Sequence, residues 1–115
     1  MNVRIYHNSR CSKSRATLSL LEERGVVCDV VNYLDMPPSA AELTQLLDML
    51  GMTPRELMRK TEAEYGELGL DDPSLDDTSL IAAMSSHPRL IERPIVVANG
   101  KAAIGRPPEA VLSIL

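Results

Sequence analysis

The feature that most constrains the fold is the alternation of strand-like and helical segments at the start of the chain. Val3 and Ile5 alternate with polar residues, which predicts a short strand over residues 3–6. Helical spacing follows from Ser12 to the stop signal Gly25, and the β-branched run 26–31 predicts a second strand buried on both faces. A strand, helix and strand with a crossover of this length favour a right-handed βαβ unit with two parallel strands.

The middle of the chain carries only helical signals. Residues 39–42 (Ser-Ala-Ala-Glu) form a capping box that predicts a helix ending at Gly51. Residues 53–56 (Thr-Pro-Arg-Glu) form a second box, with proline at the first helical position. We therefore predict a helical insertion over about residues 39–88.

Sheet character returns near the end of the chain. Residues 95–97 and 101–104 are strand-like and flank Asn99-Gly100, which is a strong hairpin signal. Pro107-Pro108 then predicts the start of a last helix. The element order predicts one α/β domain over residues 1–115. We expect a thioredoxin-like (glutaredoxin-like) four-stranded mixed sheet flanked by helices, with the helical insertion between the second and third strands.

Length and charge exclude several classes of function. A chain of 115 residues has the length of one domain. With 12 Lys and Arg against 16 Asp and Glu, its net charge of -4 argues against a broad nucleic-acid surface. The sequence has no membrane-length apolar stretch, and neither of its two cysteines has the spacing of a zinc site. We expect a cytoplasmic, monomeric protein that binds neither nucleic acid, membrane nor metal.

Cys11 is the best candidate for a nucleophile. It lies in the loop after the first strand, where βαβ units bind ligands. At a helix start, free backbone N–H groups and the helix dipole favour the thiolate. Unpaired cysteines are usually small buried hydrophobic residues. The polar, basic setting, with His7, Arg10, Lys13 and Arg15 close in sequence, favours a reactive thiol instead.

Two further residues have alternative interpretations. Cys28 lies inside an apolar strand, so a core position is favoured over a resolving or redox role. His7 either caps the turn or stabilises the Cys11 thiolate, and the sequence leaves both roles open.

Two Arg-Pro steps suggest a site for an anion. Pro94 opens a strand after Arg93, at the position where thioredoxin-like folds keep a cis proline. Arg106 precedes a predicted helix N-terminus, which already favours anions. Arginines beside a thiolate suit a tetrahedral oxyanion, because the guanidinium fork offers several fixed donors. Solvated surface charges are the alternative interpretation.

Other oxyanion architectures do not fit. Cysteine phosphatases place an arginine six residues after the cysteine, and that position is Thr17 here. The six glycines also form no Gly-rich phosphate loop. Both types of phosphate site are therefore excluded.

Residues 7–15 (His-Asn-Ser-Arg-Cys-Ser-Lys-Ser-Arg) resemble the active-site loop of the ArsC arsenate reductases of the glutaredoxin-coupled type, and the Cys-Ser-Lys-Ser run resembles their small cytosolic branch. The resemblance covers nearly the whole chain and continues through residues 33–38, 55–60, 68–70, 90–97 and 104–109. It implies a thioredoxin-like fold with a helical insertion.

The resemblance also implies a mechanism. Cys11 would attack arsenate and form a covalent thiol-arsenate adduct, with glutathione as co-substrate and no bound cofactor. Glutaredoxin would then reduce the mixed species, and arsenite would leave. The family's oxyanion-binding arginines, followed by its two thiolate-stabilising residues, fall on these positions: Arg59, Arg93, Arg106, His7 and Ser14.

Two rival functions stay open at this stage. Spx-like regulators share the fold and bind RNA polymerase, but many carry a Cys-x-x-Cys switch, and here Ser14 stands three residues after Cys11. A monothiol glutaredoxin-like thioltransferase would need the cysteine but would leave the arginines unexplained.

Overall fold

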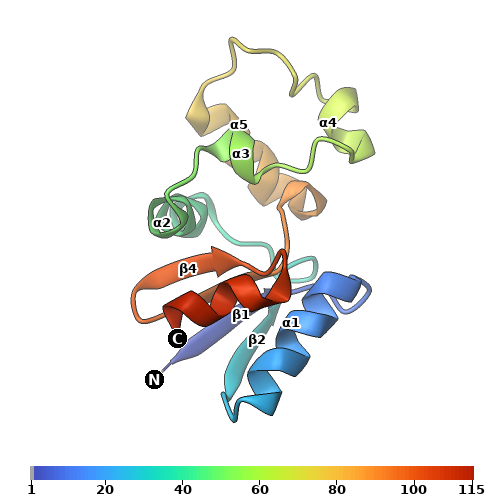
Figure 1. The fold of residues 1–115 in the computed structure, drawn as a ribbon. Helices are drawn as coiled ribbons and strands as arrows, with labels where there is room; N and C mark the ends of the chain where they lie inside the picture. Colours follow the sequence, from blue (N-terminus) through green and yellow to red (C-terminus); the bar gives the residue numbers. More distant parts are fainter. Residues whose placement is uncertain (1) are drawn as a thin grey trace. The chain divides into compact units, whose positions relative to one another are not determined.

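A mixed four-stranded sheet is the centre of the fold in the computed structural model, which describes residues 2–115 (Figure 1). Its spatial order is β2-β1-β3-β4. β1 and β2 are parallel, whereas β1 with β3 and β3 with β4 are antiparallel. The strands are β1 Val3–His7, β2 Cys28–Asn32, β3 Ile95–Ala98 and β4 Lys101–Ile104. The structure confirms the α/β, thioredoxin-like layout.

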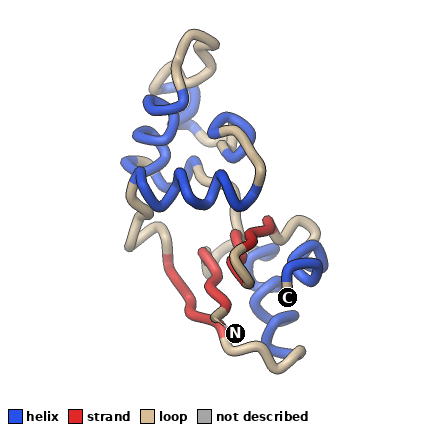
Figure 2. Tube along the Cα trace, turned by 90° about the vertical axis from the view of Figure 1, so that its left-hand side faces the viewer, coloured by secondary structure: helices blue, strands red, loops and turns tan. Residues whose placement is uncertain are grey.

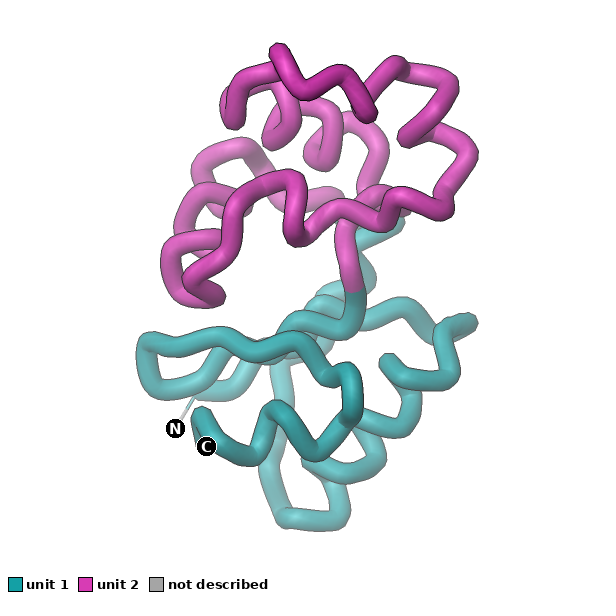
Figure 3. The backbone as a smooth tube through the Cα atoms, turned by 45° about the horizontal axis from the view of Figure 1, so that its top comes forward, with its two compact units in different colours: residues 1–36, 93–115 teal, residues 37–92 magenta. Residues whose placement is uncertain are grey.

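The chain divides into two compact units, shown in different colours in Figure 3. The sheet unit comprises residues 1–36 and 93–115, and the helical unit comprises residues 37–92. The helical unit begins and ends within a few residues of the predicted insertion, 39–88. All four strands belong to the sheet unit (Figure 2). The assignment of residues 1–115 to a single domain stays a prediction.

The core of the sheet unit lies on one face of its sheet. Residues of β1 and β3 on that face pack with α1 (Ser12–Glu23) and the 3₁₀ helix η2 (Pro108–Ile114). α1 and η2 also contact each other. Burial of this apolar set removes its surface from water, which stabilises the βαβ unit and the hairpin together. The buried members are Val3, Ile5, Leu21, Val96, Ala98, Val111 and Ile114.

The prediction for the second strand was wrong in the start of the strand and in its burial. The strand predicted over 26–31 begins only at Cys28 and is not buried on both faces, because β2 is an edge strand paired only with β1 in the described sheet. Val27 is 88% exposed and Val30 is 42% exposed. Cys28 is half-buried and packs against the edge of the core. The predicted last helix is confirmed, and it is the 3₁₀ helix η2.

The predicted hairpin is confirmed. Asn99 and Gly100 both have positive φ, 55° and 74°, as a tight two-residue turn between β3 and β4 requires. The Asn99 side-chain Nδ2 donates to the Ile114 carbonyl at 2.9 Å, which ties the turn to η2.

In the helical unit, the two capping boxes and the Gly51 stop predicted from the sequence are confirmed. The Ser39 side chain accepts a hydrogen bond from the Glu42 N–H, and Gly51 ends α2 with a φ of 67°. Thr53 and Glu56 form a complete capping box at α3. α2 and α3 both pack against α5. The elements of this unit are α2 Ala40–Leu50, α3 Pro54–Leu57, α4 Ala63–Glu67, α5 Asp77–Ser86 and η1 Pro88–Leu90.

Residues 2–115 contain neither a membrane-spanning helix nor a cluster of three or more metal-ligating side chains. None of the helices there has both the length and the apolar character needed to cross a membrane. No group of three or more His, Cys, Asp or Glu in the same range is arranged to hold a metal ion.

Candidate active site

Cys11 occupies the N-cap position of α1, directly after the turn that leaves β1. Its backbone N–H donates to the Asn8 carbonyl at 3.0 Å, and the Asn8 side-chain Oδ1 accepts from the Arg10 N–H at 3.0 Å. The Cys11 carbonyl then accepts the first helical hydrogen bond, from Arg15, at 3.0 Å. The turn therefore holds the Cys11 side chain at the helix N-terminus, where the residue is only 9% exposed.

Hydrogen-bond donors around Cys11 favour its thiolate. Burial raises the pKa of the thiol, but the backbone N–H groups of Ser14 and Lys13 and the guanidinium of Arg93 lower it. The net result is a pKa below the ordinary value of a cysteine. Arg106 adds a second guanidinium, with Nη2 3.6 Å from Sγ. Since the thiolate is the nucleophilic form of cysteine, these groups activate Cys11.

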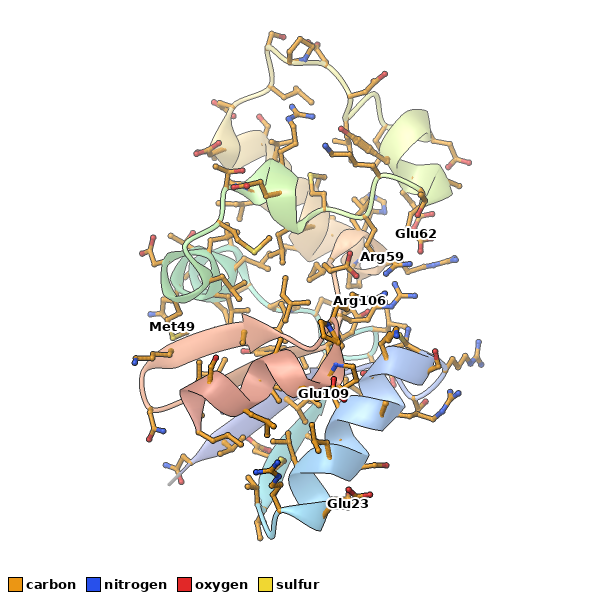
Figure 4. The ribbon with its side chains drawn as sticks, in the orientation of Figure 1. Glu23, Met49, Arg59, Glu62, Arg106 and Glu109 are labelled. Atoms are coloured by element: carbon orange, nitrogen blue, oxygen red, sulfur yellow. The ribbon has the colours of Figure 1, made fainter. Side chains whose placement is uncertain are left out.

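The topology of the sheet brings Arg93 and Arg106 to Cys11. Ile95 at the start of β3 pairs with Ile104 at the end of β4, and also with Tyr6 near the end of β1. The loops before β3 and after β4 therefore lie at the end of the sheet where the carboxyl end of β1 leads into the Cys11 turn. Arg106 Nε donates to the Arg93 carbonyl at 2.8 Å, which fixes one loop on the other. Figure 4 labels Arg106 at this end of the sheet.

Both Arg-Pro peptide bonds, Arg93-Pro94 and Arg106-Pro107, are cis. The first is the bond expected to be cis from the sequence, and the second was not expected.

His7 and Ser14 fix the loop that carries Cys11. Both are buried, and the Ser14 hydroxyl lies 2.8 Å from His7 Nδ1 while it accepts the Asn8 N–H at 3.0 Å. Burial and the charge of Arg15 lower the pKa of His7. The hydrogen bond between the Ser14 hydroxyl and His7 Nδ1 therefore holds the turn, and the imidazole tautomer decides which of the two groups donates. Their implied effect on the thiol pKa stays a prediction.

Gly105 and Thr17 are structural parts of the site that sequence reasoning missed. A Cβ on Gly105 would overlap the Thr17 Oγ1 and lie 2.9 Å from Cγ of Pro94. Thr17 is buried in α1, where its hydroxyl donates to the Lys13 carbonyl at 2.8 Å. Only a glycine next to Arg106 lets the β4 loop approach α1 this closely. A glycine directly before an Arg-Pro step was the available signal.

Arg59 belongs to the helical unit, where its side chain is ion-paired. Nη1 lies 2.8 Å from Glu92 Oε1, and Nε lies 3.3 Å from Glu62 Oε1. Its backbone N–H donates to the Leu90 carbonyl at 2.7 Å. Arg59 and Glu62 are both labelled in Figure 4. The oxyanion-binding role of Arg59 rests on the resemblance and stays a prediction.

Cys28 does not join the loop that carries Cys11. In the parallel pairing of β1 with β2, Cys28 is opposite Val3, whereas His7, just before the turn, is opposite Asn32. Four residues of strand separate these pairs, or about 13 Å. Burial, and then the charge of Glu22, raise the pKa of Cys28. The strand register therefore keeps Cys28 away from the turn that carries Cys11.

Comparison with known proteins identifies relatives over nearly the full length. The ArsC family model matches residues 6–114. An arsenate reductase of Neisseria meningitidis serogroup A is 54% identical over 114 residues, which cover 98% of this chain and 97% of that protein. Escherichia coli K12 YfgD is 61% identical over 98% of this chain and 96% of its own. The structure of an arsenate reductase from Vibrio cholerae superposes with a TM-score of 0.98, at 55% identity, and covers 100% of this chain and 98% of that one.

Proposed function

The chain belongs to the ArsC family, and from this premise we propose that it is an arsenate reductase of the glutathione- and glutaredoxin-dependent type. The observation that carries the proposal is the pair of guanidinium groups, from Arg93 and Arg106, beside the activated thiol of Cys11. A thiolate with fixed cationic donors is suited to attack an oxyanion. The names of the relatives supply arsenate as the substrate.

The first step is nucleophilic attack by Cys11. Its thiolate forms a sulfur–arsenic bond with arsenate, and one arsenate oxygen leaves, after protonation, as water. Arsenic stays pentavalent in this step. Glutathione then displaces a second oxygen in the same way, which gives an adduct in which arsenic bridges the two sulfurs.

The second step reduces arsenic. A glutaredoxin thiolate attacks the glutathione sulfur and forms a disulfide with it. The sulfur–arsenic bond to glutathione breaks, and its electron pair reduces arsenic to the trivalent state. Hydrolysis of the remaining bond to Cys11 releases arsenite and restores the thiol.

The residues of the sheet unit have separate tasks in this scheme. Arg93 and Arg106 bind the arsenate oxygens and hold the arsenic in line with Sγ. His7 and Ser14 keep the turn in place, and the N–H groups of α1 stabilise the thiolate. We assign Arg59 to the same oxyanion on the basis of the family resemblance alone.

In this scheme external thiols complete the turnover because Cys28, in β2, pairs with Val3 at the end of β1 that is remote from the Cys11 turn. Glutathione and glutaredoxin are therefore the proposed partners, and no bound cofactor is required. We further propose that the protein acts as a cytoplasmic monomer, since the chemistry needs a reducing compartment and uses no second copy.

The decisive experiment is a coupled assay with arsenate, glutathione, glutaredoxin, glutathione reductase and NADPH. We expect arsenate-dependent NADPH oxidation that Cys11→Ser abolishes. Cys28→Ser is the matched cysteine variant and should keep the activity. Absence of arsenate-dependent turnover in the unmodified protein would reject the proposal, as would full activity of Cys11→Ser.

A further inference from the structure

Three exposed cations lie close to Cys11 in sequence, Arg10 in the turn before it and Lys13 and Arg15 in the first turn of α1. Arg10, Lys13 and Arg15 are solvent-exposed, whereas Cys11 between them is buried. Within residues 2–115, the Arg10 and Lys13 side chains make no hydrogen bond or ion pair, and Arg15 uses only Nη1, on the Ser9 carbonyl at 2.9 Å. Residues 7–15 include no acidic side chain. Their charges are therefore available to a molecule that approaches Cys11.

Residues 7–15 are cationic, although the chain as a whole is acidic. The net charge of the whole chain is -4, yet the sheet unit has eight Lys and Arg against five Asp and Glu. Two of those acids, Glu22 and Glu23, lie in the last turn of α1, at the opposite end of that helix from Cys11. Figure 4 shows Glu23 and Arg106 at opposite ends of the unit. Residues 7–15 themselves carry three cations and no carboxylate, so an anion that approaches Cys11 along this segment meets positive charge.

We propose that Arg10, Lys13 and Arg15 form a docking surface for a small thiol that carries free carboxylates. The inference rests on the proposed function, which requires an external thiol at Cys11. Guanidinium groups bind carboxylates through paired N–H donors, and an ammonium group adds a further charge. A thiol of this class concentrates at the loop and presents its sulfur to the Cys11 adduct. Neutral and cationic thiols lack this advantage.

The test uses thiol–disulfide exchange, which needs no arsenate. Cys11 reacts with oxidised glutathione (anionic), bis(2-hydroxyethyl) disulfide (neutral) or cystamine (cationic). In each reaction the Cys11 thiolate attacks one sulfur, the disulfide bond breaks, and one small thiolate leaves. Intact mass spectrometry follows the mixed disulfide on Cys11. A Cys28→Ser background ensures that only Cys11 reacts.

The measured quantity is the rate with oxidised glutathione divided by the rate with the neutral disulfide. This ratio cancels any change in the thiolate fraction, because the same thiol attacks both reagents. We expect Arg10→Ala/Lys13→Ala to lower the ratio by about fivefold to tenfold at low ionic strength. The rate with cystamine, relative to the neutral disulfide, should rise. Salt at about 0.5 M should remove most of the selectivity.

Arg24→Ala/Lys101→Ala is the matched control. Both residues are exposed cations of the sheet unit, one at the C-cap of α1 and one in β4, so the control removes the same charge away from the Cys11 loop. Its ratio should equal that of the unmodified protein.

Two results would overturn the proposal. An unchanged ratio in Arg10→Ala/Lys13→Ala would show that these side chains do not select anions. An equal fall in the control would show that net charge, rather than a docking surface, sets the selectivity. A failed arsenate assay with the expected loss of selectivity would reject the arsenate reaction and leave the docking surface standing.

Discussion

Burial and hydrogen bonding have opposite effects on Cys11, and the donors prevail. Because the pKa of Cys11 lies below its ordinary value, the thiolate persists to lower pH than in a free cysteine and is lost only as pH falls through that lowered pKa. Arg93→Ala removes one of the donors and should move the pKa of Cys11 upward. The measurement is the iodoacetamide alkylation rate of Cys11 against pH, in a Cys28→Ser background.

Arg24→Ala is the control for this titration, since it removes an exposed arginine at the other end of α1. Its alkylation profile should superpose on that of the unmodified protein. If Arg93→Ala gave the same profile, the guanidinium would not be a donor to the thiolate.

Arg59 has a structural task that can be tested apart from any anion. Its partners Glu62 and Glu92 have side chains only 16% and 27% exposed, so Arg59→Ala removes a cation from two partly buried carboxylates. Glu62 keeps its ion pair with Arg89, whose Nη2 lies 3.5 Å from Oε2. We expect a loss of about 1 kcal/mol in the free energy of unfolding, measured with urea. The double variant Arg59→Ala/Glu92→Gln should recover part of it. An undiminished free energy in Arg59→Ala would show that the ion pairs contribute nothing to stability.

Individual residues differ in how far the sequence reveals them. Cys11 could be identified because its environment, a helix start in a basic loop, is local in sequence. The convergence of Arg93 and Arg106 depends on strand register, which sequence spacing does not contain. The ion pair of Arg59 with Glu92 joins residues far apart in the chain, and only the structure shows it.

At the level of elements, the contact between the β4 loop and α1 depends on the absence of a side chain at Gly105. Gly105→Ala would force Thr17 or Pro94 to move. Overpacking of this kind costs about 1–3 kcal/mol, which a urea titration would detect. Cys11 reactivity should fall as well, because Arg106 is the next residue.

Gly66→Ala is the matched substitution. Gly66 lies in α4, has no neighbour within 4 Å of an added Cβ, and does not have a positive φ. Alanine there should raise stability by about 0.5–1 kcal/mol. Equal effects of the two substitutions would contradict the close approach at Gly105.

Elements defined by local chemistry were predicted well. The capping box at Thr53, the Gly51 stop and the Asn99-Gly100 turn all depend on a few neighbouring residues. The burial of β2 was mispredicted because a run of valines has the same appearance in a central strand and at an edge. Whether a second strand lies beside it is decided by the whole sheet order.

For the whole molecule, the uneven charge distribution was hidden by the composition. The helical unit has four Lys and Arg against eleven Asp and Glu, so most of the acidity lies outside the sheet unit. A net charge of -4 does not show where in the chain the cations gather. Position along the chain, rather than total charge, therefore carries the information about the site.

The acidic groups of the helical unit predict how stability depends on pH. Hydrogen bonds to Thr53, Ser74 and Ser79 lower the pKa values of Glu56, Asp72 and Asp76. A lowered pKa in the folded state contributes stability at neutral pH that is lost as pH falls through that pKa. We therefore expect the thermal midpoint to fall between about pH 5 and pH 3.

Asp76→Asn tests one of these groups, because asparagine keeps an N-cap acceptor for α5 without a titrating carboxyl. Its thermal midpoint should depend less steeply on pH over the same range. A pH profile identical to that of the unmodified protein would show that the Asp76 cap does not contribute to the acid sensitivity.

The central claim is that Cys11 and the two arginines form one oxyanion site, and arsenate protection of Cys11 from alkylation tests it most directly. The rate of iodoacetamide modification is measured with and without arsenate, in a Cys28→Ser background. We predict that arsenate slows modification of the parent protein and has little effect on Arg93→Ala or Arg106→Ala. Equal protection in these variants, or no protection in the parent, would contradict the account.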